Sequence, residues 1–170
     1  AKEVAKAVLA EWGRIDVLIN NAGRSMPVGI REITEDQWDT TIDVDLKSCF
    51  NYIQAVVPAM DQRGFGRIVS MSSLNAHSGG VTAAVSKFAY AAAKAGIIGM
   101  TRALAKELGP QIAINCVCPG LIKTELTGKN PVIAAREPEL IEGIALKRTG
   151  TPSDVAQLVT FLATAEPMFI

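Results

Sequence analysis

A tyrosine and a lysine lie four positions apart in the alanine-rich stretch AYAAAK, residues 89–94. On a helix, Tyr90 and Lys94 face the same side, and the alanines between them let a flat ligand approach closely. A cation beside a phenol lowers the phenol pKa from about 10, which suits a group that gives a proton to a ketone or takes one from an alcohol. The pair predicts acid–base chemistry, and two polar residues on a helix surface are the ordinary alternative.

Three apolar segments with strand character alternate with helical patterns along the chain. The strands are expected at 15–20, 67–72 and 113–118. Helices are expected at 2–12, at 85–108 and from Thr151 onwards. A further helix is expected to begin at a Thr34–Gln37 capping box, to bend at Pro58 and to end at the glycines at 64 and 66. Strands that are apolar on both faces and separated by crossover helices predict an α/β fold with a parallel sheet covered on both sides.

The segments that follow the strands are the expected ligand-binding region. Parallel sheets bind ligands beyond the carboxyl ends of their strands. The three segments are NAG at 21–23, SSLNA at 72–76 and PGLIKT at 119–124. All three are therefore expected on one rim of the sheet.

Composition excludes several classes of function. Seventeen basic and seventeen acidic residues cancel, which gives no electrostatic footprint for nucleic acid or an anionic membrane surface, and no apolar run is long enough to span a bilayer. Cys49, Cys116 and Cys118 form neither a zinc nor a CxxC pattern, so we expect reduced thiols in the cytoplasm and no metal site. His77, the only histidine, is expected to be an ordinary loop residue.

Both ends of the chain favour a single partial domain over 1–170. The sequence begins inside a helical pattern and stops at EPMFI, where a further strand would start. A sheet of three strands would leave both edges open. We therefore expect the interior of a longer chain, with 127–150 as a mobile loop and a short helix.

Four motifs in fixed order carry a family resemblance. They are NNAG at 20–23, GRIVSMSS at 66–73, YAAAKAG at 90–96 and NCVCPGLIKTEL at 115–126. Together they resemble the short-chain dehydrogenase/reductase family over nearly the whole chain. The resemblance implies a Rossmann-type doubly wound sheet in three αβα layers, NAD or NADP as cofactor, and reversible hydride transfer between nicotinamide and a ketone or secondary alcohol. It also implies a homotetramer that packs through the helices at 34–62 and 85–108.

The resemblance assigns roles to individual residues. Tyr90 matches the proton-transferring tyrosine, and Lys94 matches the lysine that lowers its pKa and holds the nicotinamide ribose. Ser73 matches the serine that binds the substrate oxygen, with Ser72 as the alternative. The implied cofactor contacts are Asn21, Ala22 and Gly23 along the adenosine side, Pro119 and Gly120 beneath the nicotinamide, and Ile122 and Thr124 at its carboxamide.

Asp45 departs from the family pattern, which usually has an asparagine that anchors a water in the proton relay. Helical spacing places Asp45 in an apolar stripe, so we expect its carboxyl group to be buried, and to need a partner or a raised pKa. The relay water could be held by the Asp45 oxygens or through a distortion of the helix backbone. A lost or altered relay is the alternative.

Two further departures concern the pocket wall and the cofactor. The loop between Ser73 and Tyr90 exceeds the common spacing and includes Lys87, so it is expected to reshape the substrate pocket. The glycine-rich phosphate loop is absent, which we attribute to truncation rather than to loss of function.

Two functions therefore stay open. One is an oxidoreductase, with 3-oxoacyl-thioester reductases and sugar or xenobiotic carbonyl reductases as the nearest possibilities; the other is a non-catalytic binding or assembly subunit. The 127–150 segment, with Arg136 and Arg148, is expected to form a lid over a small-molecule carbonyl or alcohol substrate. Arg148 is expected to be structural rather than a carboxylate clamp.

Overall fold

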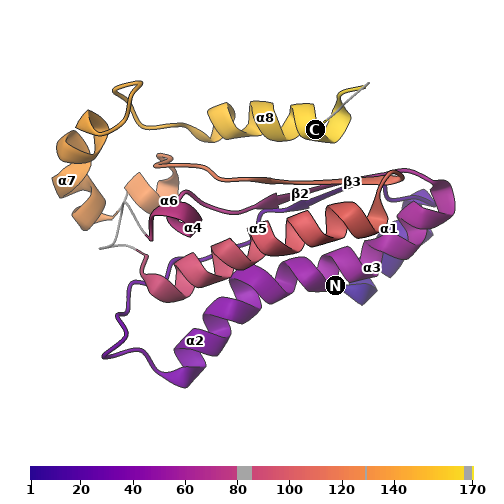
Figure 1. Cartoon of the computed structure of the whole chain (residues 1–170), viewed down its shortest axis with the longest axis horizontal. Helices are drawn as coiled ribbons and strands as arrows, with labels where there is room; N and C mark the ends of the chain where they lie inside the picture. Colours follow the sequence, from indigo (N-terminus) through magenta and orange to yellow (C-terminus); the bar gives the residue numbers. More distant parts are fainter. Residues whose placement is uncertain (80–85, 129, 167–169) are drawn as a thin grey trace.

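Three parallel strands form the centre of the molecule (Figure 1). The computed structural model describes residues 1–79, 86–128, 130–166 and 170. The strands are β1 (Val17–Asn20), β2 (Gly66–Met71) and β3 (Ile112–Val117), in the order β1-β2-β3. Asn20 pairs with Ser70 in the ladder, and Ser70 pairs with Cys116. The parallel arrangement is confirmed, and the bounds of each predicted strand agree with the structure to within two residues.

Helices flank the strands. They are α1 (Lys2–Trp12), α2 (Glu35–Ile42), α3 (Ser48–Arg63), α4 (Asn75–Ser78), α5 (Phe88–Leu108), α6 (Glu125–Gly128), α7 (Pro131–Glu142) and α8 (Pro152–Thr164). The Thr34–Gln37 capping box is present, and Gly64 ends α3 in the left-handed conformation, as predicted. Helix α5 begins at Phe88; Val85, the predicted start, lies outside the described residues. The 127–150 segment contains the twelve-residue α7, which is longer than the short helix predicted there.

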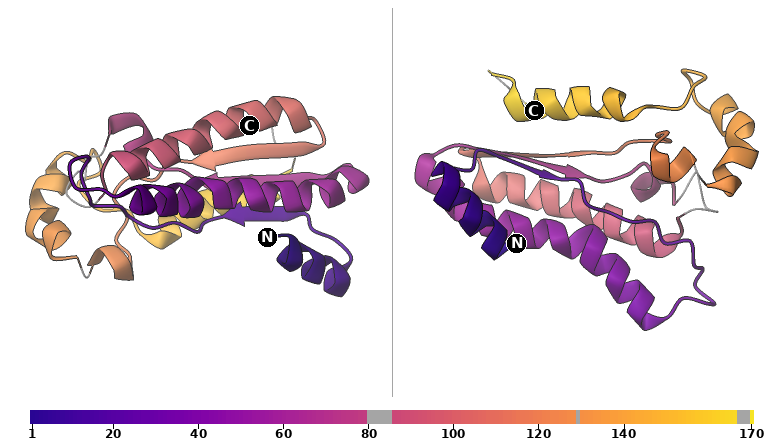
Figure 2. Two further views of the ribbon diagram at one scale, coloured as in Figure 1. Left: turned by 90° about the horizontal axis from the view of Figure 1, so that it is seen from below. Right: turned by 180° about the vertical axis from the view of Figure 1, so that it is seen from behind.

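The sheet has α1, α3 and α5 on one side and α8 on the other (Figures 1 and 2). Met60 and Ile68, each fully buried, lie in the core on the α3 side. On the opposite face, Val69 and Val117 pack against Leu162 of α8. The predicted parallel sheet with helices on both faces is confirmed. Helix α8 packs over β2 and β3, and Val17 and Ile19 of β1 are each 38% exposed.

A π-helical segment, η1 (Asp43–Lys47), joins α2 to α3. The sequence predicted a bend at Pro58, which lies within α3, and it offered a distortion of the helix at Asp45 as one alternative; the π-helical segment includes Asp45. Leu46 of this segment packs directly on α5 at Gly96, where a Cβ atom would lie 2.7 Å from Leu46 Cδ2. The absence of a side chain at Gly96 therefore lets η1 approach α5 closely.

Two glycines of α5 form a matched pair for a stability test. A methyl group at Gly99 would have no other atom within 4 Å, so Gly99→Ala should raise the free energy of unfolding by about 0.5–1 kcal/mol through helix propensity. Gly96→Ala gains the same propensity but drives a methyl group into Leu46, so it should be less stable than Gly99→Ala by at least about 1 kcal/mol. Urea unfolding followed by circular dichroism measures both. Equal stabilisation by the two substitutions would contradict close packing of η1 on α5.

Candidate active site

A cavity of about 880 Å³ opens at the carboxyl ends of the strands. Its lining includes residues from all three segments that follow the strands, together with side chains of α5 and α7. They include Asn21, Gly23, Ser72, Ser73, Tyr90, Lys94, Pro119, Gly120, Ile122, Thr124, Ile133 and Leu140. The prediction that these segments share one rim is confirmed, and the volume is typical of a site for a small molecule or cofactor.

Lys94 is buried inside this rim, with 3% of its surface exposed. Its Nζ donates a hydrogen bond to the carbonyl oxygen of Met71 at 2.9 Å and lies 3.5 Å from Asp45 Oδ1. The same nitrogen lies 5.5 Å from the centre of the Tyr90 ring. The end of β2 and segment η1 thus fix the lysine beside the tyrosine, as the helical spacing predicted.

The Asp45 carboxyl group is fully buried, as expected. Oδ1 accepts a hydrogen bond from the Arg24 backbone N–H at 3.0 Å, whereas Oδ2 has no hydrogen-bond partner among the described residues. Burial raises the pKa of Asp45, and the Arg24 N–H and the Lys94 charge oppose that rise. A methyl group at Gly23 would lie 2.8 Å from Oδ1 and 3.3 Å from Lys94 Nζ. Glycine in the NAG turn therefore leaves room for the Asp45–Lys94 pair.

The two serines after β2 make different contacts. Ser72 is 4% exposed, and its hydroxyl donates to the Lys94 carbonyl at 2.8 Å, which ties β2 to α5. The Ser73 oxygen accepts from the Asn75 backbone N–H at 3.2 Å, and Ser73 lines the cavity beside Tyr90. This geometry favours Ser73 over Ser72 as the residue that binds a substrate oxygen.

The Tyr90 phenol has a raised pKa rather than the lowered one predicted from the sequence. Burial is the largest cause, the Asp45 charge adds to it, and a side-chain hydrogen bond with Ser73 opposes it. The prediction is wrong because the Lys94 ammonium is directed at Met71 O and Asp45 Oδ1. Tyr90 is therefore a protonated phenol, ready to donate, around neutral pH.

The residues expected on the cofactor side occupy the same rim. Asn21, Gly23, Pro119 and Gly120 line the cavity, as do Ile122 and Thr124, whereas Ala22 is exposed in the turn and does not line it.

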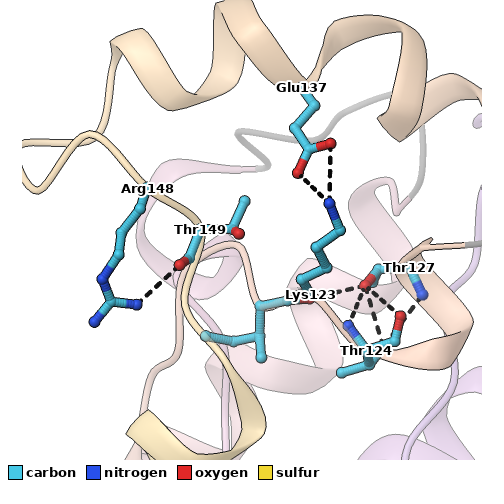
Figure 3. A network of polar contacts seen from close by, with 7 residues as sticks. Lys123, Thr124, Thr127, Glu137, Arg148 and Thr149 are labelled. Carbon is cyan, nitrogen blue, oxygen red and sulfur yellow. Dashed lines mark hydrogen bonds and ion pairs between the residues drawn. The ribbon is translucent and has the colours of Figure 1, made fainter.

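The Thr124 hydroxyl is engaged locally: Thr124 and Thr127 exchange hydrogen bonds between their backbone N–H groups and hydroxyls at 2.7 and 3.2 Å (Figure 3). This exchange orders the turn at the start of α6.

Two ion pairs hold the 123–154 region together. Lys123 Nζ lies 2.9 Å from Glu137 of α7 (Figure 3). Arg148 makes a two-point contact with Asp154, both at 2.8 Å, and donates to the Thr149 carbonyl. The Arg148 guanidinium already binds the Asp154 carboxylate at the start of α8, so these contacts agree with the expected structural role of Arg148.

Two features of the site were not identified from the sequence. One is the ion pair between Asp45, on the π-helical segment, and Lys94. The other is Asn75, which is buried and lines the cavity two residues after Ser73. Asn75 stands in the SSLNA segment, but a lone asparagine in a loop carries no spacing that distinguishes it from a turn residue.

Metal-binding clusters and membrane-spanning helices are both missing from the part of the chain that the structure describes. Among the described residues, histidine, cysteine and acidic side chains form no group that could hold a metal ion. None of the helices, within the residues placed by the structure, has the length and apolarity needed to cross a membrane.

Comparison with known proteins identifies the family. The family model described as enoyl-(acyl carrier protein) reductase matches residues 1–170. A 3-oxoacyl-[acyl-carrier-protein] reductase of Thermotoga maritima is 44% identical over 170 residues, covering 99% of this chain and 67% of the relative. The chain belongs to the short-chain dehydrogenase/reductase family. A short-chain type dehydrogenase/reductase of Sinorhizobium fredii is 40% identical over 158 residues, covering 92% of this chain and 61% of the relative.

The fold of this short-chain dehydrogenase/reductase chain also matches solved structures. ElxO with NADP bound superposes with a TM-score of 0.88 at 30% identity, over 99% of this chain and 68% of that one. The chain spans about two thirds of the length of the curated relatives it matches. The Rossmann-type fold expected from the motifs is therefore confirmed.

Removing the Asp45 charge should lower the pKa of Tyr90. The carboxylate raises that pKa, so Asp45→Asn should shift the phenol titration to lower pH. The chain has two tyrosines, and a Tyr52→Phe background isolates the Tyr90 signal in an ultraviolet absorbance titration.

Asp43→Asn is the matched control for this titration, because Asp43 lies on the same π-helical segment but is exposed and paired with Lys47. A Tyr90 titration that is identical in the Asp45→Asn variant and the parent would contradict electrostatic contact between the two groups.

Proposed function

We propose that this chain carries the catalytic centre of an NAD(P)-dependent oxidoreductase that interconverts a ketone and a secondary alcohol. The observation that carries the proposal is the convergence of Tyr90, Lys94 and Ser73 on one cavity at the carboxyl ends of parallel strands. Supporting it, a related solved structure is titled as having NADP bound, and a relative is named as a 3-oxoacyl-[acyl-carrier-protein] reductase.

The donor set of the cavity suits a nicotinamide nucleotide. Lys94 would bind the ribose hydroxyls, and the side-chain-free Gly23 leaves room for a flat ligand beside Lys94 Nζ. The other residues assigned to the cofactor are Asn21 and Ala22 on the adenosine side, and Pro119, Gly120, Ile122 and Thr124 around the nicotinamide. The bound cofactor supplies or accepts the hydride.

The side chains of this chain manage the proton and the substrate oxygen. In reduction, the Ser73 hydroxyl donates a hydrogen bond to the carbonyl oxygen while Tyr90 delivers its proton to the developing alkoxide. The raised pKa of Tyr90 keeps that proton in place around neutral pH. Oxidation of an alcohol runs through the same contacts in reverse.

Recharging Tyr90 with a proton is the step we assign to Lys94 and Asp45. Lys94 Nζ lies between the Tyr90 ring and Asp45 Oδ1. Asp45 Oδ2 has no hydrogen-bond partner among the described residues, so it can accept a hydrogen bond from a relay water. Asp45 is then a positioning residue that acts through Lys94 in place of the usual asparagine.

The 127–150 segment would form the wall of the substrate pocket. Ile133, Leu140 and Ile144 line the cavity from α7 and the turn after it. These side chains suit a substrate with an apolar portion beside its carbonyl group. Ketones carrying an alkyl chain, including 3-oxoacyl thioesters, are the first candidates.

The proposal extends to a homotetramer in the cytoplasm. Phe50 on α3 is 47% exposed, and Trp38 of α2 stacks on Phe88 of α5 with ring centres 5.7 Å apart. These residues lie on the helices that the family resemblance places between subunits. The free thiols of Cys49, Cys116 and Cys118 fit a reducing compartment.

Replacing Tyr90 tests the proposed function. In the whole protein, Tyr90→Phe should lower kcat for ketone reduction about 10²- to 10⁴-fold, because it removes the general acid and keeps the ring. The affinity for NADPH should change by less than about threefold, since the Lys94 contacts stay in place. Absorbance of the reduced nicotinamide gives kcat, and fluorescence titration gives the affinity.

Tyr52→Phe is the control for this experiment, because Tyr52 does not line the cavity. Turnover by Tyr90→Phe equal to that of the unsubstituted protein would remove Tyr90 from the mechanism. Binding of NADPH with no reduction of any ketone would favour the binding or assembly subunit instead.

A further inference from the structure

Two cysteines share one face of the chain at the end of β3, outside the chemistry proposed above. Ile112 and Ile114 of this strand face the core formed with α3 and α5, whereas Val117 faces α8. Alternate residues of a strand lie on the same face, so Cys116 and Cys118 continue the α5 side. Both are free cysteines and both are half-buried. The end of the strand therefore carries a pair of thiols that the proposed reaction does not use.

The surroundings of Cys116 agree with this placement. Burial raises the pKa of the Cys116 thiol, a hydrogen bond with Thr101 of α5 opposes the rise, and the neighbouring Cys118 thiol adds to it. Thr101 is itself buried on α5. The two thiols are thus close to each other between the sheet and α5, and the thiolate of Cys116 is disfavoured.

An extended strand holds these two side chains further apart than a disulfide bond allows. Side chains on one face repeat about every 6.6 Å along a parallel strand, whereas the Cβ atoms of a disulfide lie about 3.5–4.5 Å apart. A bridge between Cys116 and Cys118 therefore requires the backbone to bend at Val117. A strained disulfide is readily reduced, so such a bridge is reversible.

The backbone around Val117 is joined to the segment that carries Ser73. The Val117 carbonyl accepts a hydrogen bond from the Ser72 N–H at 2.8 Å. The Pro119 carbonyl accepts one from the Leu74 N–H at 2.9 Å. These two bonds lie on either side of Ser73 in the sequence, and Pro119 and Ser73 both line the cavity. A bend at Val117 therefore loosens the rim of the cavity.

We propose that Cys116 and Cys118 form a reversible oxidation site, at which a disulfide bond bends the end of β3 and lowers the activity of the neighbouring cavity. The oxidant is a low-molecular-weight disulfide such as oxidised glutathione. Disulfides in a reducing compartment are usually transient and redox-sensing, which suits a strained bridge. The expected loss of activity rests on the proposed function, whereas the oxidation and the loosening of the rim do not.

The oxidation proceeds in two exchange steps. The Cys118 thiolate attacks one sulfur of oxidised glutathione, which forms a mixed disulfide and releases one glutathione. The Cys116 thiolate then attacks the Cys118 sulfur, which forms the intrachain disulfide and releases the second glutathione. Cys116 takes the second step because burial disfavours its thiolate. The two protons lost by the cysteines pass to the two glutathione thiolates, and two electrons pass from the cysteines to the glutathione disulfide.

Mass spectrometry of the whole protein, after treatment with oxidised glutathione, tests the site. The protein should lose the mass of two hydrogen atoms, and peptide mapping should place the bridge between Cys116 and Cys118. Cys49 is 2% exposed and should stay a thiol, so it serves as the internal control. Cys116→Ser should stop at the mixed disulfide and gain the mass of one glutathione. A protein in which Cys116 and Cys118 stay unbridged would overturn the inference.

Two further readouts follow the consequence of the bridge. Hydrogen–deuterium exchange at the Ser72 and Leu74 amides should be at least about tenfold faster in the oxidised protein. The kcat for ketone reduction should fall at least about tenfold, since a displacement of about 1 Å in a site can cost about 10²-fold. Dithiothreitol should restore both. Cys118→Ser cannot form the bridge, so its exchange and kcat should not change with the oxidant.

The outcomes separate this inference from the proposed function. A bridge that leaves the exchange unchanged, or that leaves the kcat of an active protein unchanged, would overturn the inference. An equal fall of kcat in Cys118→Ser and in the unsubstituted protein would also overturn it, because the bridge would not be the cause. If the bridge forms and speeds the exchange but the reduced protein converts no ketone, the oxidation site stands and the proposed function fails.

Discussion

The burial of the Lys94 ammonium is the constraint on which the rest of the site depends. A buried lysine needs hydrogen-bond acceptors and a compensating charge, since an unpaired ammonium in the interior is strongly unfavourable. Met71 O at the end of β2 and Asp45 Oδ1 on η1 meet these needs. The strand, the helical segment and α5 are therefore held in register around one nitrogen atom, and the Tyr90 ring is placed beside it.

Several local features follow from that arrangement. Gly23 has no side chain because Asp45 Oδ1 and Lys94 Nζ occupy the space where a methyl group would lie. The Ser72 hydroxyl donates to the Lys94 carbonyl, whereas Ser73 lines the cavity beside Tyr90. The η1 segment brings the Asp45 carboxylate beside Lys94, and its charge contributes to the raised pKa of Tyr90.

The sequence predicted the strands, the sheet and most helices because apolar periodicity and capping residues are local signals. It also predicted that Tyr90, Lys94 and the three segments after the strands lie on one rim, since parallel strands align their carboxyl ends. The direction of the Tyr90 pKa shift was not predictable, because it depends on whether Lys94 points at the phenol or at Asp45. The partial exposure of Val17 and Ile19 on β1 likewise depends on distant packing, which periodicity does not report.

Direct transfer of hydride is the central claim, and isotope labelling tests it most directly. The whole protein is incubated with a ketone and reduced nicotinamide cofactor that carries deuterium at the transferring carbon, and the alcohol is examined by NMR. The account predicts one deuterium on the carbinol carbon of the product, with none acquired from solvent at that position. An alcohol without deuterium at that carbon, or no alcohol from any ketone, would contradict it.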